Sequence, residues 1–360
     1  MSTIVIGAGL AGIFAARTLA ATGEDVIVVE ATEHLGGRTR GRRDVLQHDQ
    51  VADLGASFID VGQDAIIQFC VENGVEITPR IAMFPKGPNG RYSGASIMLG
   101  NVVVDGAAVA MDARQKLALE VDDALVAQPP LGTETTLAWA RRVGLSPQAR
   151  DMYVMQGVFN PVTTPGLVPS WHVHPGDIGR ICWLLADGTD SVARKAAEGL
   201  DIRYSSPVRL VSREGRAYRV ETDGDSFVAD NVIVTCSVTA TRKIGFAPAL
   251  PEWKAHALLM TPMSQGGKIV AQYRDGQKIV EHGGPSTMTD SQVGMFWLKP
   301  GPDDTVTVLG TIADEGDGLL QDEAAALAIL DRQIEAVTGS TPDRVAGLVH
   351  DWTTDEFFGG

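Results

Sequence analysis

The fold is decided by residues 4–12, which read IVIGAGLAG, and by residues 26–30, which read VIVVE. An apolar strand, a glycine-rich turn, an Ala-rich helix and a second apolar strand predict a βαβ unit of the dinucleotide-binding type. Gly7 suits the tight turn, Gly9 lets the backbone approach a pyrophosphate, and Gly12 lets the helix and strand pack closely. Glu30 ends the second strand, where a carboxylate can accept hydrogen bonds from a ribose diol.

The composition is typical of a globular chain. Of its 360 residues, 44% are hydrophobic, and no apolar run is long enough to span a membrane. The first strand begins next to Met1, so we expect no signal peptide, no membrane partner and a cytoplasmic location. The formal charge of -15 argues against nucleic acid as a partner. The three cysteines form no CxxC pair, and we expect them to be reduced, mostly buried and without chemistry.

Hydrophobic periodicity predicts the order of elements along the rest of the chain. Helices are expected over residues 10–21, 62–74, 112–127 (with Asp112 as N-cap) and 322–337. A β-meander is expected from strands at 202–204, 208–211, 218–221 and 226–228, followed by a buried strand at 232–234 and later strands at 268–273 and 305–311. Nucleotide-type strands thus flank a largely helical stretch, which predicts one domain interrupted by another.

Further motifs make the sequence resemble the flavin-containing amine oxidase family, the fold of monoamine and polyamine oxidases. They are residues 30–31 (EA), 35–39 (LGGRT), 53–57 (DLGAS), 206–208 (SPV), 246–251 (FAPALP), 266–270 (GGKIV), 351–352 (DW) and 357–360 (FFGG). Residues 264–268 (SQGGK) and 350–352 (HDW) look most similar to bacterial 6-hydroxynicotine and pseudooxynicotine oxidases.

This resemblance implies an α/β fold of two domains, in the manner of monoamine oxidase. A Rossmann-like FAD-binding domain would comprise residues 1–76, 184–258 and 353–360. A substrate-binding domain of mixed sheet and helices would comprise residues 77–183 and 259–352. The family normally continues for several tens of residues past the position of Gly360, with an aromatic cage residue and a helix facing the flavin. We therefore expect the sequence to be a piece of a longer protein rather than a degraded relative.

The resemblance also implies FAD as the cofactor, because the Gly-Gly-Arg doublet belongs to this flavoprotein group. Arg38 would contact the pyrophosphate, the backbone of Val208 would hold the adenine, and residues 55–57 would run beside the isoalloxazine ring. The expected cofactor-binding residues are Gly7, Gly9, Ala11, Gly12, Glu30, Ala31, Gly37, Arg38, Gly55, Ala56, Ser57, Val208 and Trp352.

Two residues are expected to act in catalysis by the same resemblance. A lysine at the position of Lys268 reaches the flavin N5 through a water and helps reoxidation by dioxygen. Asn160 aligns with a substrate-facing asparagine of the nicotine-type oxidases. The expected reaction is hydride transfer from the α C–H of a secondary or cyclic amine to flavin N5, giving an imine, with O2 reduced to H2O2. The expected partners are the amine and O2, and a homodimer is an expected assembly.

Four alternatives remain open at this point. An L-amino-acid oxidase would need an arginine in the substrate pocket, for which Arg80 and Arg91 are available. A natural-product tailoring amine or amide oxidase would share the fold, and a flavin desaturase need not keep Lys268. A non-catalytic flavin-binding relative is the alternative of another class. No metal site is expected, because His172 and His174 have no third ligand cluster beside them.

Overall fold

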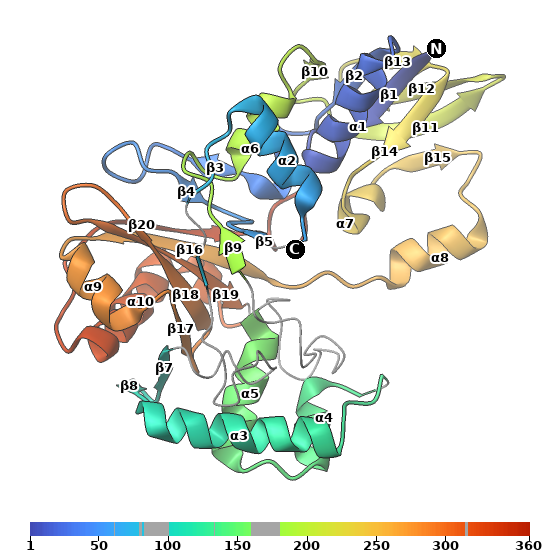
Figure 1. Ribbon diagram of the computed structural model, residues 1–360. Helices are drawn as coiled ribbons and strands as arrows, with labels where there is room; N and C mark the ends of the chain where they lie inside the picture. The colour runs from blue at the N-terminus through green and yellow to red at the C-terminus, as the bar shows by residue number, and fades with distance from the viewer. Residues whose placement is uncertain (61, 79–80, 83–100, 133, 160–180, 314–315) are drawn as a thin grey trace.

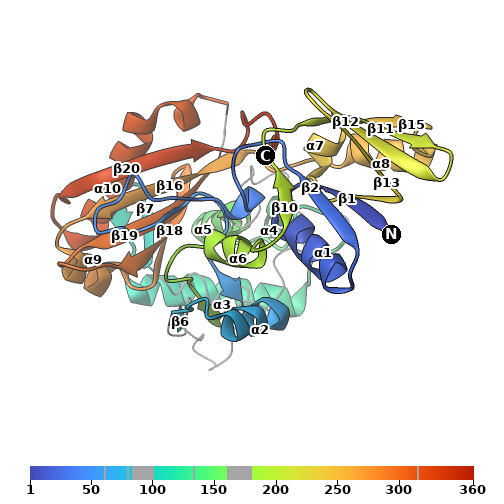
Figure 2. The same ribbon diagram turned by 90° about the horizontal axis from the view of Figure 1, so that it is seen from above.

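The computed structural model describes residues 1–60, 62–78, 81–82, 101–132, 134–159, 181–313 and 316–360. Its main parts are a parallel sheet with flanking helices, an antiparallel meander, a seven-stranded sheet and a group of helices (Figure 1). The meander and the seven-stranded sheet lie toward opposite ends of the molecule, with the parallel sheet between them (Figure 2). Mixed helices and sheets of this kind confirm the predicted α/β class.

The parallel sheet is built on the N-terminal βαβ unit. Its strand order is β10 (Asp201–Arg203), β2 (Asp25–Val29), β1 (Ser2–Ile6) and β14 (Asn231–Val234). Helix α1 (Leu10–Ala21) has the predicted bounds and buries Gly12, Ile13 and Ala16. One apolar cluster joins it to α2 (Asp64–Asn73) and α6 (Asp190–Ala196). The pairing of β1 with β14 and of β2 with β10 places strands from before and after the interrupting sequence in one sheet.

The meander sheet has the order β13 (Ser226–Ala229), β12 (Ala217–Thr222), β11 (Val208–Glu214) and β15 (Gly245–Ala247). One expectation here was wrong, because the strand predicted at 202–204 is β10 and pairs in parallel with β2 instead of joining the meander. Period-two sequence identifies a strand but not its partner, and the short loop between β10 and β11 did not reveal that β10 pairs with β2.

The seven-stranded sheet is buried on both faces at its centre. Its order is β20 (Arg344–Asp351), β16 (Gly266–Tyr273), β19 (Val306–Ala313), β18 (Val293–Pro300), β17 (Ser286–Thr289), β7 (Asn101–Val104) and β8 (Ala107–Ala108). Alternate residues of β16 enter two cores: Ile269 and Ala271 pack with α10 (Glu323–Thr338), whereas Val270 packs with α3 (Met111–Ala127) and α5 (Pro147–Phe159). Lys268 has the same parity as Val270 and therefore shares its face.

The remaining elements connect these parts. Two small sheets pair β3 (Gly41–Arg42) with β4 (Ala52–Asp53), and β9 (Ile181–Trp183) with β5 (Ile59–Asp60) and β6 (Ile81–Ala82). The other helices are α4 (Thr136–Arg142), α7 (Val238–Thr241), α8 (Glu252–Met260), α9 (Gly276–Gly283), and the 3-10 turns Gly37–Thr39 and Leu319–Gln321. Within the described residues, no helix has the length and apolarity needed to cross a bilayer.

The N-termini of α10 and α3 show which residues act as helix caps. Asp322 caps α10 as a carboxylate should, accepting a hydrogen bond from the backbone N–H of Ala325 at 3.0 Å. The cap expected at Asp112 was wrong, because α3 is capped by Ala110 and Asp112 lies in its first turn. A carboxylate in that turn still faces the positive end of the helix dipole, so both positions suit the same residue type. The predicted domain bounds remain a prediction.

Candidate functional site

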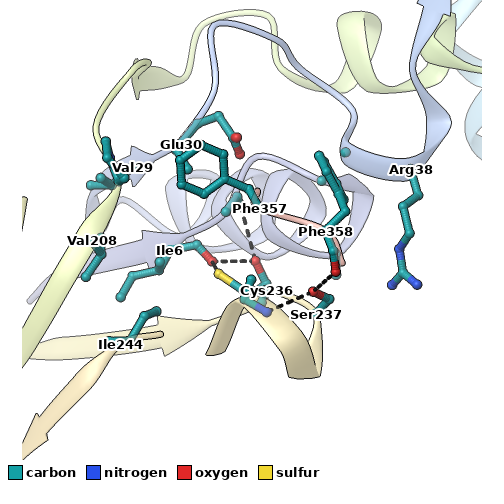
Figure 3. Close-up of a pocket in the computed structure, with 18 of the residues that line it drawn as sticks. Ile6, Val29, Glu30, Arg38, Val208, Cys236, Ser237, Ile244, Phe357 and Phe358 are labelled. Atoms are coloured by element: carbon teal, nitrogen blue, oxygen red, sulfur yellow. Dashed lines mark hydrogen bonds between the residues drawn. The ribbon is translucent and has the colours of Figure 1, made fainter. Parts of the chain in front are cut away.

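A cavity of about 270 Å³ opens at the carboxyl ends of the parallel strands (Figure 3). It lies where β1, β2 and β14 end, the edge at which open α/β sheets bind ligands. Predicted cofactor-binding residues in its wall are Gly7, Gly9, Ala11, Glu30, Ala31, Gly37, Arg38 and Val208. Residues not predicted include Thr235, Cys236, Ser237, Lys243, Ile244, Phe357 and Phe358. We call this cavity the nucleotide pocket.

The glycine-rich turn presents backbone without side chains to the nucleotide pocket. Two of its glycines, Gly9 and Gly12, are needed for different reasons. A Cβ at Gly12 would lie 1.9 Å from the carbonyl oxygen of Gly7, so only glycine lets α1 start against β1. A Cβ at Gly9 would meet nothing closer than the Cα of Gly37 at 4.0 Å. Gly9 therefore leaves room above the turn for a ligand, whereas Gly12 is required by packing alone.

Glu30 presents a buried carboxylate to the pocket, with 8% of the residue exposed. One oxygen accepts from the N–H of Ala8 at 2.7 Å, and the other accepts from the N–H and hydroxyl of Thr32 at 2.9 and 2.8 Å. These bonds fix the carboxylate at the strand end. The oxygen bonded to Ala8 has a further lone pair, so the group can still accept a bond from a ribose hydroxyl.

Arg38 is exposed at the pocket wall. Its guanidinium forms no hydrogen bond or ion pair within the described part of the chain. The other two cationic side chains of the wall have partners: Arg209 pairs with Asp223 at 2.7 Å, and Lys243 donates to the carbonyl of Glu356. Arg38 is therefore free for a bidentate pair with a phosphate.

A second cluster surrounds Lys268, which is 4% exposed. Its ammonium donates to the carbonyl of Gly55 at 3.0 Å and to the hydroxyl of Ser57 at 2.9 Å. The nitrogen also lies 4.1 Å from the ring centroid of Trp297, within reach of a cation–π interaction. Burial lowers the pKa of Lys268 to about 7, although the charge of Asp53 raises it in part. We call these residues the lysine site.

Side chains from distant elements hold residues 53–57 in place at the lysine site. The indole N–H of Trp352 donates to the carbonyl of Leu54 at 2.7 Å. The hydroxyl of Thr189 shares its single proton between the carboxylate of Asp53 at 3.0 Å and the carbonyl of Ala56 at 2.8 Å. Three parts of the chain, around residues 189, 268 and 352, thus converge on one short segment.

The lysine site adjoins the nucleotide pocket through the backbone of Arg38. The N–H of Ala56 donates to the carbonyl of Arg38 at 3.1 Å, and a Cβ at Gly55 would lie 1.9 Å from that oxygen. Trp352 makes an edge contact with the ring of Phe358, which lines the pocket, at 4.9 Å between centroids. The two regions therefore form one continuous candidate site.

Most predicted residues converge here, and some cannot be placed. Gly12 lies behind the pocket rather than in its wall, and Gly55, Ser57 and Trp352 belong to the lysine site. Ala56 lines a neighbouring cavity of about 410 Å³. Asn160, Arg80, Arg91, His172 and His174 lie outside the described residues. Among the residues that are described, no three histidine, cysteine or acidic side chains gather as metal ligands would.

Three of the pocket residues that sequence reasoning missed lie at the end of one strand. Thr235, Cys236 and Ser237 follow β14, which had been predicted as a buried strand but not as a neighbour of β1. The rule that parallel strands place ligands at their carboxyl ends could have found them. Trp297 carried no signal, because its place beside Lys268 depends on the pairing of β18 with β19 and of β19 with β16. Cys70 and Cys182 are buried, as predicted, whereas Cys236 is partly exposed at the wall of the nucleotide pocket.

The residues present fit a flavin dinucleotide. The turn at Gly9 lacks side-chain atoms where a pyrophosphate would lie, a buried carboxylate stands at the end of β2, and an unpaired arginine stands beside them. Residues 55–57 offer close-packed backbone where a flat ring could approach. This set of donors, acceptors and bare backbone matches the chemistry of a ribose, a phosphate pair and a ring system.

Comparison with known proteins identifies the class. The model of the flavin-containing amine oxidoreductase family matches residues 10–360, and the chain belongs to this family. FAD, the cofactor predicted from the sequence, is the cofactor of the family.

Individual relatives agree. The chain is 28% identical over 307 residues to polyamine oxidase 2 of Arabidopsis thaliana, covering 76% of this chain and 58% of that protein. It is 25% identical over 320 residues to (S)-6-hydroxynicotine oxidase of Paenarthrobacter nicotinovorans, covering 77% and 70%. The fold matches cyclohexylamine oxidase of Brevibacterium oxydans with a TM-score of 0.79 at 21% identity, covering 100% of this chain and 86% of that chain. The chain spans 56 to 65% of the length of the first curated relatives it matches.

Proposed function

We propose that this chain carries the cofactor and lysine sites of an FAD-dependent amine oxidase that converts a secondary or cyclic amine to an imine and reduces O2 to H2O2. The observation that supports the proposal most directly is the buried ammonium of Lys268, held 3.0 Å from the carbonyl of Gly55 at the end of the nucleotide pocket. Family membership supports the reaction class, and the amine class comes from the resemblance to nicotine-type oxidases.

The fit of the pocket assigns a role to each of its polar groups. Glu30 would accept from the ribose hydroxyls, Arg38 would pair with the pyrophosphate, and the turn at Gly9 would approach the same phosphates. The backbone of residues 55–57 would lie along the ring system. When bound, FAD supplies a two-electron acceptor for the α C–H of the amine and passes the electrons to O2.

Lys268 can place a positive charge in the site, and burial determines the pH at which its amine carries that charge. A cation in a site with little water favours negative charge that develops nearby more strongly than it would in bulk water. With a pKa of about 7, the amine can also exchange a proton near neutral pH. Aromatic rings border the site, with Phe58 and Trp297 at 4.8 Å between centroids, and they offer an apolar surface for the carbon skeleton of an amine.

The first experiment is an absorbance spectrum of the purified protein, followed by anaerobic addition of secondary amines, cyclic amines and L-amino acids. Flavin bands that bleach with a cyclic or secondary amine and return in air would support the proposal. Bleaching by L-amino acids alone would replace it with the amino-acid oxidase alternative. Bound flavin that no amine reduces would favour a non-catalytic relative.

A variant tests the role of Lys268 separately. Lys268→Met should slow the return of the oxidised flavin in air on the order of 10²-fold, while anaerobic reduction by substrate changes far less. Stopped-flow absorbance measures the two half-reactions independently. Lys195→Met, which changes a lysine of α6 paired with Glu198 at 2.8 Å, is the matched control and should leave both rates unchanged. Equal slowing of both half-reactions by Lys268→Met would remove the lysine from the oxygen step.

A further inference from the structure

The buried ammonium of Lys268 has no carboxylate in direct contact. Its two hydrogen-bond acceptors, the carbonyl of Gly55 and the hydroxyl of Ser57, are neutral dipoles, and no ion pair of Lys268 occurs within the described residues. A buried cation that interacts only with dipoles and one ring tends to lose its proton. Something else in the fold must therefore balance the charge if the lysine is to be a cation at neutral pH.

Asp53 is a buried acid two residues from one of those acceptors. It begins the segment that ends at Ser57, and it is 2% exposed. Its carboxylate accepts from the N–H and the hydroxyl of Thr189 at 2.8 and 3.0 Å, which favours the ionised form. The same hydroxyl donates to the carbonyl of Ala56, so Thr189 holds the carboxylate and the lysine-binding backbone in one rigid unit.

The other titratable groups near Lys268 cannot take this role. His350 lies opposite Lys268 on β20, but a histidine is either neutral or positively charged and cannot balance a cation. Burial lowers the pKa of His350 and so favours its neutral form. Lys299, at the end of β18, is a second cation near Asp53 and donates to the carbonyl of Ala186 at 3.2 Å. On β19 the residue opposite Lys268 is the uncharged Thr311. Asp53 is therefore the one acid among these neighbours in the described structure.

We propose that Asp53 is the counter-charge of Lys268, a positioning residue that keeps the lysine protonated without touching it. Burial raises the pKa of Asp53 above its usual value, and the bonds from Thr189 and the charges of Lys299 and Lys268 offset only part of that rise. When it is ionised, Asp53 favours the protonated form of Lys268, whereas Lys299 acts on Asp53 more strongly than Lys268 does. The inference deepens the proposed function, because the charge of Lys268 matters only if chemistry takes place beside it.

The test uses the protein without added cofactor or substrate, so it can fail or succeed independently of the oxidase proposal. Urea unfolding would be measured from pH 5.5 to 10.5 for the wild type and Lys268→Met, each with and without Asp53→Asn. The native lysine releases its proton near pH 7, whereas the unfolded lysine keeps its proton until about pH 10.5. Between these values the unfolded state binds more protons, so the lysine-dependent part of the stability rises with pH and levels off above 10.5.

Asp53→Asn should move the onset of that rise to lower pH by about one unit, since an opposite charge at short range shifts a pKa by roughly that much. Asp53→Glu should restore the onset, and Ser191→Ala, which removes only a local bond to the carbonyl of Gly188 beside Thr189, should leave it in place. The same onset with and without the carboxylate would overturn the proposal. If Asp53→Asn does not fold, Asp53→Ser takes its place: an onset lowered by about one pH unit supports the pairing, and an onset at the wild-type pH contradicts it.

Discussion

The nucleotide pocket and the lysine site are adjacent but are built in different ways. Half of the residues that line the pocket come from one βαβ unit, residues 6–11 and 29–39, and the other half come from residues 206–209, 235–244 and 357–358. The lysine site needs residues 53–57, Thr189, Lys268, Trp297 and Trp352, which are brought together from the seven-stranded sheet, the residue that follows its strand β20, the end of β4 with the segment after it, and the start of α6. A site made from neighbours in sequence depends on local backbone geometry, whereas an assembled site depends on the packing of whole layers.

The largest effect should come from changing the backbone turn of the pocket. Gly12→Ala would place a methyl group 1.9 Å from the carbonyl oxygen of Gly7, and we expect a loss of about 3 kcal/mol or more in the free energy of unfolding. Gly9→Ala is the matched control, because its φ of -72° suits alanine and no atom lies closer than 4.0 Å.

Urea unfolding of both variants, together with FAD titration, distinguishes packing from ligand contact. Gly9→Ala should unfold like the wild type yet bind FAD more weakly. If both variants were equally unstable, Gly9 would also be a packing residue and the space above the turn would not be reserved for a ligand.

A smaller effect is expected at the strand end of the pocket. Glu30→Ala removes the acceptor of the Ala8 N–H, which should cost about 1–3 kcal/mol of stability, and removes the proposed ribose contact. FAD affinity should fall on the order of 10²-fold, measured by flavin fluorescence on titration. Asp230→Asn, at the other end of the same sheet, changes a carboxylate bonded to Ser2 and should not alter FAD affinity. Unchanged affinity in Glu30→Ala would rule out the ribose assignment.

The smallest effect tests the assembled site. Thr189→Val removes the hydroxyl that joins Asp53 to Ala56 but keeps the backbone bond to Asp53, so we expect a loss of about 1 kcal/mol. Differential scanning calorimetry would measure it. Ser191→Ala, which removes a local bond to the carbonyl of Gly188 in the same helix turn, is the control for general effects on α6. A loss no greater than that of the control would show that Thr189 does not fix the segment.

Sequence reasoning succeeded where a residue's role depends on its chain neighbours. The bounds of α1, the turn glycines and the acid at the end of β2 follow from spacing, because a βαβ unit closes on itself within about thirty residues. The same reasoning misplaced β10, which pairs with β2 across more than 170 residues, as the register of Asp201 with Ile27 shows. Strand periodicity does not specify a distant partner.

The sequence by itself thus determined the class of the fold, the glycine turn and strand-end acid around which the nucleotide pocket forms, and the choice of Lys268 as a candidate site residue. Only the tertiary structure decided that the ammonium of Lys268 is buried between Gly55, Ser57 and Trp297, and that Asp53 is buried in the segment that binds it. The physical reason is range. Turn geometry and hydrogen bonding along the chain act between neighbours, whereas burial and the charge state of a lysine depend on every layer that excludes water from it.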